Sequence, residues 1–387
     1  MERDITRLSM NRRDVIKLMA VAGIAVTANY YPHLSAPLNA PWLDFNPENI
    51  FGDRFPDLKN YRVIAPEHRL PTGLDGLYSN SPRLYLSDEM TQAQYLDKIK
   101  TFGKRVRLFI NDEFEPQLGQ YNDNITGRIA RFAQKVDGVE IDLADFFTIG
   151  NCLTDNPVYG HNIPSSPYNP IKDRTGYNHV YTDPKMVGAF QKRIDHAVNR
   201  LLNVYHVDNI KAWSFNEPAP PTNSEGREIL TAWYQKMVDT IRQIDPKTPI
   251  FSGVAVPWFI NEKAVPGLTA NTFHLYPFNS VNFQRLSDYL HSPQSVLPLI
   301  CQEIGFPEQV FGHHIPNELY DYLYNNFINK LINYTTVFDH ENKLIKPEVL
   351  SVGVWKIDDY SDGFNANPYS SPLKLLQWWF KNVILKL

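Results

Sequence analysis

The feature that most constrains the fold of this 387-residue chain is a repeated alternation of strand-like and helix-like segments, which begins near residue 83. The strand-like segments are short and rich in β-branched and aromatic residues. Longer segments with apolar residues at helical spacing follow them. In residues 184–205 this spacing is carried by Met186, Phe190, Ile194 and Val198. Such alternation is typical of a parallel sheet whose strands are connected by helices.

Counting these segments distinguishes between two kinds of parallel sheet. We predict strands at residues 83–86, 105–110, 139–147, 210–215, 250–254, 272–276, 297–304 and 352–357, the first of them the weakest. We predict helices at residues 88–102 (with Ser87 as the N-cap), 127–136, 184–205, 225–244, 317–334 and 373–384. Eight strands with intervening helices favour an α/β fold, a closed (β/α)8 TIM barrel in a single domain. An open doubly wound sheet is the alternative, but no glycine-rich phosphate loop follows an early strand.

The N-terminal residues have the features of an export signal. Arg12 and Arg13 precede a mildly apolar run, 18–28, which is too short to span a membrane. Val26-Thr27-Ala28 is a plausible cleavage site. The arginine pair resembles the twin-arginine signal by which bacteria export folded proteins. A chance arginine pair in an ordinary signal peptide, or an uncleaved anchor, is the alternative.

These features predict a domain organisation and a location. Residues 1–28 are expected to be a signal peptide of the twin-arginine type, 29–60 an extended lead-in and 61–387 the barrel. The protein is then expected to contact the twin-arginine export machinery transiently and to be periplasmic or secreted. No later segment is long and apolar enough to predict a stable membrane association.

Composition argues against several classes of partner. The net charge of −4 and the pI near 6.3 give no electrostatic reason to expect a nucleic acid. No cluster of His, Cys and Asp has the spacing of metal ligands, and no cofactor motif is present, so we expect neither metal nor cofactor. Cys152 and Cys301 fit no redox motif, and either buried thiols or a bridge remain open for them.

Two glutamates stand where a barrel carries its chemistry. Catalytic residues of such barrels project from the C-terminal ends of the strands. Glu217 follows the strand at 210–215, and Glu303 lies near the end of the strand at 297–304. A buried carboxylate is costly unless it has a partner or a function. A salt bridge would explain one such glutamate, whereas two of them at strand ends favour a catalytic pair.

The residues around this pair carry a family resemblance. Asn216-Glu217-Pro218 and the later Glu303 resemble clan A glycoside hydrolases, most closely family 5, the cellulases and β-mannanases. Further marks occur in the order that the family shows, over roughly residues 95–380: Arg107, Tyr181-Thr182-Asp183-Pro184, His274 and Tyr276 in a His-x-Tyr pattern, and Trp355. Any one of these motifs is short, and their order makes the resemblance specific.

The resemblance implies a retaining glycosidase that cleaves a β-linked polysaccharide or oligosaccharide. Such an enzyme needs two carboxyl groups about 5 Å apart, one protonated and one ionised. By resemblance, Glu217 is the general acid and base, and Glu303 is the nucleophile. Arg107 and Tyr276 would stabilise Glu303, and Asn216 would bind the 2-hydroxyl group of the sugar. The resemblance also implies that His274 belongs to the site and that Trp355 lies beneath the sugar, and Trp258 is a candidate for stacking on a distal sugar.

Two departures from the family leave the substrate open. Ala219-Pro220-Pro221 follows Asn-Glu-Pro, where mannanases of this type often have an arginine. Asp145-Phe146-Phe147 stands where cellulase-like members usually have a histidine. We therefore predict an endo-β-mannanase or an endo-β-glucanase, with a slight preference for a mannan-like substrate. The competing hypothesis is a non-catalytic carbohydrate-binding barrel, although loss of activity would be expected to remove part of the glutamate pair or its supporting residues.

Overall fold

The structure is a computed structural model of the chain. It describes residues 70–71, 74, 76–103, 105–144, 149, 167–168, 179–218, 224–255, 265–275, 297–304, 309–310, 313–314, 336–338, 344–347 and 351–354. The predicted signal peptide, the predicted lead-in and the helices predicted at 317–334 and 373–384 lie outside these residues, as does Cys152.

One parallel sheet organises the molecule. Its strands follow the spatial order β4-β3-β2-β1-β11-β6-β5, and every neighbouring pair is parallel. The strands are β1 (Gly76–Asn80), β2 (Val106–Phe109), β3 (Val139–Asp142), β4 (Ile210–Ser214), β5 (Asn271–Leu275), β6 (Leu299–Ile304) and β11 (Ser351–Val354). The order of β1 to β4 in space repeats their order in the sequence, as the alternation of strands and helices predicts.

A short segment joins the two edges of this sheet. Ile250 forms a parallel bridge with Trp213 of β4, and Phe251 forms one with Ala270, directly before β5. The Phe251 N–H donates to the Trp213 carbonyl at 2.8 Å, and the Ser252 N–H donates to the Ala270 carbonyl at 3.1 Å. The segment thus takes the place of a strand between β4 and β5, and the described strands close into the predicted barrel.

The first strand of the barrel lies elsewhere than predicted. It is β1, which pairs with β11 and β2, whereas Leu84–Leu86 form a 3₁₀ turn, so the strand predicted at 83–86 was wrong. Leu84 and Tyr85 are buried as a strand would require, but the turn buries them against helix α3. The sequence of β1, Gly-Leu-Tyr-Ser-Asn, has weak strand propensity because glycine and asparagine are rare in strands. Its polar residues Ser79 and Asn80 are nevertheless buried.

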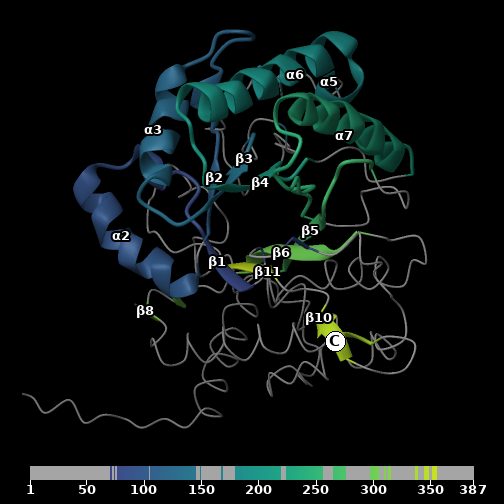
Figure 1. Cartoon of the computed structure of the whole chain (residues 1–387). Helices are drawn as coiled ribbons and strands as arrows, with labels where there is room; N and C mark the ends of the chain where they lie inside the picture. The colour runs from purple at the N-terminus through teal and green to yellow at the C-terminus, as the bar shows by residue number, and fades with distance from the viewer. Residues whose placement is uncertain are drawn as a thin grey trace, which may run out of the picture.

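The helices cover the outside of the strands (Figure 1). They are α2 (Glu89–Phe102), α3 (Asp123–Ala133), α5 (His179–Thr182), α6 (Pro184–Asn199), which ends in a π-helical turn (Arg200–Val204), and α7 (Ser224–Ile244). Asp88, and not the predicted Ser87, caps α2 by accepting a 2.8 Å hydrogen bond from the Thr91 N–H. Helix α3 begins four residues earlier than predicted (127 − 123 = 4), because Asn122 caps it. Two short antiparallel pairs were not predicted: β7 (Gln309–Val310) with β8 (His313–His314), and β9 (Thr336–Phe338) with β10 (Leu344–Pro347).

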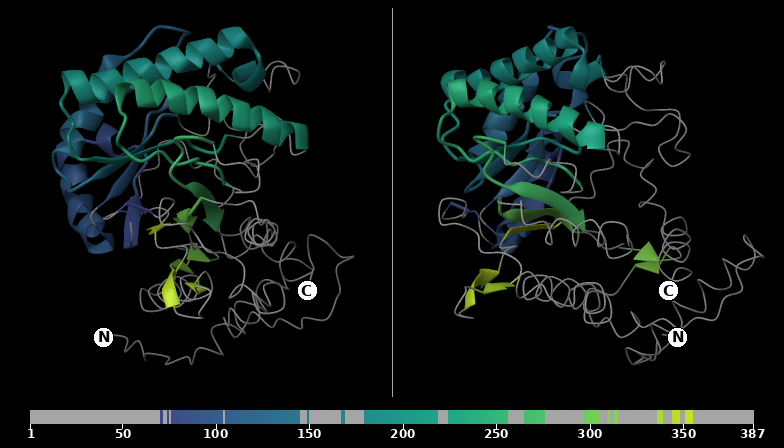
Figure 2. Two further views of the ribbon diagram at one scale, coloured as in Figure 1. Left: turned by 45° about the vertical axis from the view of Figure 1, so that its right-hand side comes forward. Right: turned by 90° about the vertical axis from the view of Figure 1, so that its right-hand side faces the viewer.

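The apolar core lies between the helices and the strands. Helices α6 and α7 pack side by side over the β4 side of the sheet (Figure 2). Phe190 and Phe215 pack on the Trp233 ring with centroids 5.3 and 5.4 Å apart. Within the described part of the chain, none of the helices combines the length and the apolar character that a membrane span requires.

The inside of the barrel combines a small apolar cluster, which includes Tyr78, Ala212, Phe251 and Ile300, with a large group of polar side chains. Barrels of this kind usually fill their interior with branched aliphatic side chains. Here several charged and amide side chains from different strands are buried there instead: Asn80, Arg105, Arg107, Glu140, Asp142, Gln302 and Glu303. This interior leads directly to the predicted catalytic pair.

Candidate active site

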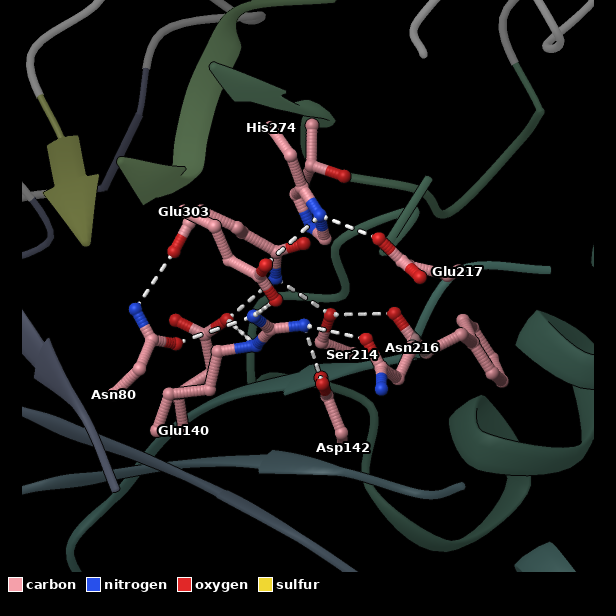
Figure 3. Close-up of polar contacts among 12 residues, drawn as sticks. Asn80, Glu140, Asp142, Ser214, Asn216, Glu217, His274 and Glu303 are labelled. Carbon is pink, nitrogen blue, oxygen red and sulfur yellow. Dashed lines mark hydrogen bonds and ion pairs between the residues drawn. The ribbon is translucent and has the colours of Figure 1, made fainter. Parts of the chain in front are cut away.

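The guanidinium group of Arg107 is the centre of the site, and Figure 3 shows the acids and amides that surround it. Arg107 lies on β2 and is completely buried. Its Nη1 lies 2.9 Å from Oε1 of Glu303, and its Nη2 lies 2.6 Å from Oδ2 of Asp142. Its Nε lies 3.7 Å from Oε1 of Glu140. Each of the three nitrogens of Arg107 on β2 therefore faces a different carboxylate, of which two come from β3 and one comes from β6.

Two amide side chains complete the surroundings of Arg107. Nη1 also donates to Oδ1 of Asn80 at 3.2 Å, and Nη2 donates to Oδ1 of Asn216 at 3.2 Å. Asn80 in turn donates from Nδ2 to the backbone carbonyl of Gln302 at 2.9 Å. These contacts hold the planar guanidinium in one orientation, which a lysine could not reproduce.

The two predicted catalytic glutamates meet at His274 on β5 (Figure 3). Nδ1 of His274 lies 2.8 Å from Oε1 of Glu217 and 3.1 Å from Oε2 of Glu303. One ligand atom of each of the three side chains lies within 4.8 Å of the other two. The side chain of Glu303 is 6% exposed and that of Glu217 is 28% exposed. Glu303 is therefore the buried member of the pair, and Glu217 is the member that lies nearer to solvent.

The backbone of Glu217 is held in an uncommon conformation. Its φ is 46°, in the left-handed region, which is strained for a residue with a side chain. Its N–H donates to the carbonyl oxygen of Gly253 at 2.8 Å. Gly253 also has a positive φ, 68°, and a Cβ atom there would lie 1.2 Å from the carbonyl oxygen of Phe215. Only glycine allows residue 253 to lie this close to the Phe215 carbonyl oxygen. This close packing determines the position of the loop after β4 and therefore of Glu217.

Burial and charge act in opposite directions on the groups around Arg107. Burial alone would lower the pKa of Arg107, but Asp142, Glu303 and Glu140 together raise that pKa above its ordinary value. Burial raises the pKa of Asp142 to about 7, although Arg107 opposes that rise. Burial and the nearby Glu140 raise the pKa of Tyr78 well above its usual range. Arg107 is therefore a permanent cation, and the Tyr78 phenol stays neutral.

A second arginine extends the network towards the opposite end of the barrel. Nε of Arg105 lies 3.1 Å from Oε2 of Glu140, and its Nη2 donates to Oγ of Ser351 at 2.8 Å. Gln302 donates from Nε2 to Oε1 of Glu140 at 2.6 Å and to Oγ of Ser214 at 2.8 Å. Charges of alternating sign thus run along the barrel interior from Arg105 to Glu303.

The structure brings together five of the residues predicted for the site: Arg107, Asn216, Glu217, His274 and Glu303. Tyr276, Trp258 and Trp355 lie outside the described residues. Sequence reasoning missed Asn80, Glu140, Asp142 and Gln302. The pattern Val-Glu-Ile-Asp of β3 could have revealed the two acids, since alternate residues of a strand share one face. Glu217, His274 and Glu303 also offer the oxygen and nitrogen atoms that a divalent metal accepts.

Comparison with known proteins supports the fold. The sequence matches no protein-family model, and it matches no curated protein significantly. Among solved structures, the endo-1,4-β-mannanase from Rhizomucor miehei is 17% identical with a TM-score of 0.53, over 81% of this chain and 99% of that one. The chain has the barrel fold of that enzyme. The resemblance to glycoside hydrolases that the motifs indicated is therefore confirmed at the level of the fold.

Two further structures have the same fold. An exo-β-1,4-mannosidase from Opitutaceae bacterium strain TAV5 is 14% identical with a TM-score of 0.54, over 84% of this chain and 63% of that one. An endo-β-1,4-mannanase from Thermotoga petrophila is 14% identical with a TM-score of 0.53, over 79% of this chain and 77% of that one. Identities this low establish the architecture, and function must be argued from the site.

Proposed function

We propose that this protein is a retaining glycoside hydrolase that cleaves a β-linked polysaccharide or oligosaccharide by double displacement. The observation that carries the proposal is the approach of Glu217 and Glu303, whose carboxylate oxygens lie within 4.8 Å of each other beside His274. Retaining enzymes hold their two carboxyl groups about 5 Å apart, whereas inverting enzymes separate them by about 6.5 to 9.5 Å to admit a water molecule. The short separation supports retention.

The surroundings of the two glutamates support different roles. Glu303 is buried and lies against the permanent cation Arg107, which favours the ionised carboxylate that a nucleophile must be. Glu217 is the more exposed of the two and is the general acid and base. In the first step Glu303 attacks the anomeric carbon while Glu217 protonates the departing oxygen. In the second step Glu217 removes a proton from water, which displaces Glu303 and releases the sugar.

His274 and Asn216 orient the reacting groups. A proton on Nδ1 of His274 can be shared by Glu217 and Glu303, because both carboxylates lie within hydrogen-bond distance of that nitrogen. Asn216 accepts from Arg107 through Oδ1, so its Nδ2 is the group that donates to the 2-hydroxyl of the sugar. Such a contact strengthens as positive charge develops at the anomeric centre. Tyr276, Trp355 and Trp258 are proposed to complete the substrate contacts.

A mannan-like substrate is the first candidate. The similar structures are named as endo-acting mannanases and an exo-acting mannosidase, which supports a β-mannan or manno-oligosaccharide over a β-glucan. Hydrolysis of mannan, glucan, xylan and cellulose by the wild type, Glu217→Gln and Glu303→Gln tests both points. We expect cleavage of mannan, release of the β-anomer first, and a loss of activity of about 10²-fold or more in each variant. Binding of a polysaccharide without cleavage by the wild type would identify a carbohydrate-binding barrel instead.

We further propose that residues 1–28 direct export by the twin-arginine machinery and that residues 61–387 form one barrel domain. Arg12 and Arg13 in front of the apolar run support this proposal. Replacing both arginines with lysine is expected to leave the protein in the cytoplasm of a bacterial host, as measured by cell fractionation. Unchanged export of that variant would indicate an ordinary secretory signal.

A further inference from the structure

Among the residues that the structure describes, the barrel interior holds more carboxyl groups than guanidinium groups. Two arginines, Arg105 and Arg107, face three acids, Glu140, Asp142 and Glu303, and all five side chains are buried. Two guanidinium groups balance two carboxylates, and His274 is shared between Glu303 and a fourth acid, Glu217, which leaves one acid in surplus. A buried carboxylate without a compensating charge is so unfavourable that it takes up a proton instead. One member of this cluster therefore carries a proton under conditions in which exposed acids are ionised.

The contacts of the three acids indicate which one carries that proton. Glu140 lies between both arginines and accepts a 2.6 Å hydrogen bond from Gln302. Glu303 faces Arg107 on one side and His274 on the other. In the described part of the chain, Asp142 contacts a single cation, Arg107, which it shares with both other acids. Asp142 is therefore the acid whose negative charge is least compensated.

The remaining groups around Asp142, among the residues that the structure describes, are neutral. Ser214 of β4 offers it a hydroxyl group. Tyr234 of α7 lies close enough for Asp142 to influence it, and burial raises the pKa of Tyr234 well above its ordinary value. Tyr78 of β1 faces the same arginine and likewise stays neutral. The groups that set the charge at Asp142 are thus Arg107 with Arg105 behind it, and the acids Glu140 and Glu303.

We propose that Asp142 is a positioning residue that carries the surplus proton of this cluster, so that the positive charge of Arg107 is directed at Glu303. The proposal rests on the proposed function, in which Glu303 is the nucleophile. With Asp142 neutral, the positive charge of Arg107 is not divided between Asp142 and Glu303. Burial raises the pKa of Asp142 to about 7, so above that pH a second negative charge appears beside Arg107. The charge of Arg107 is then divided between Asp142 and Glu303.

The pH dependence of kcat/KM separates this role from a purely structural one. In Asp142→Asn the side chain is neutral at every pH. Its acid limb is expected to stay in place, because Asp142 is already protonated there in the wild type. Its alkaline limb is expected to move to lower pH by about 0.5 to 1 unit, since the negative charge that the wild type gains beside Arg107 above about pH 7 is missing. A shift of the acid limb to lower pH in Asp142→Asn would overturn the proposal, because it would show that Asp142 is ionised throughout.

A spectroscopic measurement tests the proton without reference to activity. The infrared difference spectrum between the wild type and Asp142→Asn at pH 6 is expected to contain the carbonyl band of a protonated carboxyl group, which disappears as the pH rises above about 7. The matched control is Asp245→Asn. Hydrogen bonds from Thr248, Trp213 and Lys247 outweigh burial and lower the pKa of Asp245, so its difference spectrum is expected to lack this band. Absence of the band for Asp142 at pH 6 would refute the proposal.

The two measurements also separate this proposal from the proposed function. A wild type that cleaves no glycoside but shows the Asp142 band would contradict the hydrolase assignment and retain the surplus proton. An active wild type without the band would support the hydrolase assignment and refute the surplus proton on Asp142. If Asp142→Asn does not fold, as judged by circular dichroism, the wild type labelled with ¹³C at the aspartate carboxyl carbons replaces it. One buried aspartate titrating near pH 7 is then the expected result, and its absence again refutes the proposal.

Discussion

The backbone N–H of Glu217 donates a 2.8 Å hydrogen bond to the carbonyl oxygen of Gly253, and both residues have φ in the left-handed region, at 46° and 68°. The two belong to neighbouring segments of the barrel, the loop after β4 and the segment that closes the sheet. The position of the proposed acid and base therefore depends on a glycine that is not itself one of the proposed catalytic residues.

Gly253→Ala is expected to reduce activity strongly, because the added Cβ would lie 1.2 Å from the Phe215 carbonyl oxygen and would displace the loop that carries Glu217. A displacement of about 1 Å can cost roughly 10²-fold in rate. The matched control is Gly119→Ala, since Gly119 also has a positive φ, 76°, but no atom lies within 4 Å of a Cβ there. That variant is expected to lose only about 1 kcal/mol of stability and to keep its kcat/KM. Equal kinetic losses in both variants would contradict this account.

Arg107→Lys is expected to lower kcat by about 10²-fold, because an ammonium group cannot reproduce the fork that contacts Glu303 and Asp142 together. Arg105→Lys is the control. Arg105 contacts Glu140 and Ser351, so its replacement is expected to lower the midpoint of thermal unfolding with a much smaller effect on kcat. Steady-state kinetics and thermal denaturation of both variants distinguish a loss of kcat caused by the altered charge beside Glu303 from a loss caused by lower stability of the fold.

Substrates with a strongly acidic leaving group are expected to distinguish the two glutamates. Such a group departs without protonation, so Glu217→Gln is expected to recover a burst of aryl glycoside cleavage, followed by slow hydrolysis of the glycosyl-enzyme. Glu303→Gln is expected to remain inactive, since no nucleophile is left. Pre-steady-state release of the chromophore checks this difference. The opposite result would exchange the roles of Glu217 and Glu303.

Stability is expected to depend on pH through Asp142. Its pKa is about 7 in the folded protein and 3.8 in an unperturbed aspartate, so between these limits the folded state binds more protons than the unfolded state. The contribution of Asp142 to stability is therefore present below about pH 4 and is lost as the pH rises to about 7. Across that window Asp142→Asn is expected to gain up to about 4 kcal/mol relative to the wild type. Urea unfolding of both proteins at pH 4 to 8 measures this gain. A difference in the free energy of unfolding that stays constant over this pH range would contradict the prediction.

Chelation tests the alternative that the Glu217, His274 and Glu303 side chains hold a metal. Double displacement by two carboxyl groups uses no metal ion, so treatment with EDTA is expected to leave kcat/KM unchanged. Loss of activity on chelation and its recovery with a divalent cation would instead identify a metal-dependent hydrolase.

Local sequence patterns were sufficient for much of the architecture. The β-branched and aromatic runs located β2, β4, β5 and β6, and apolar residues at helical spacing located α6 and α7. These features report on short-range preferences, which act within a few residues. The same patterns placed Glu217 and Glu303 at strand ends. A charged side chain at the end of an apolar run indicates a functional site there, because its burial is costly without a partner or a function. The strand β1 was missed because its pairing with β2 and β11, and not its propensity, stabilises it.

The sequence by itself therefore determined the barrel and the two glutamates, while the tertiary structure decided how the charges inside the barrel are paired. Arg107 and Glu303 are 196 residues apart, and no local pattern states that Asp142 and Glu140 share the same guanidinium. Nor does the sequence show that Gly253 must admit the Phe215 carbonyl. Contacts of this kind exist only once the sheet closes, since closure brings the inward-facing side chains of distant strands into one buried volume, where each charge must find a partner or a proton.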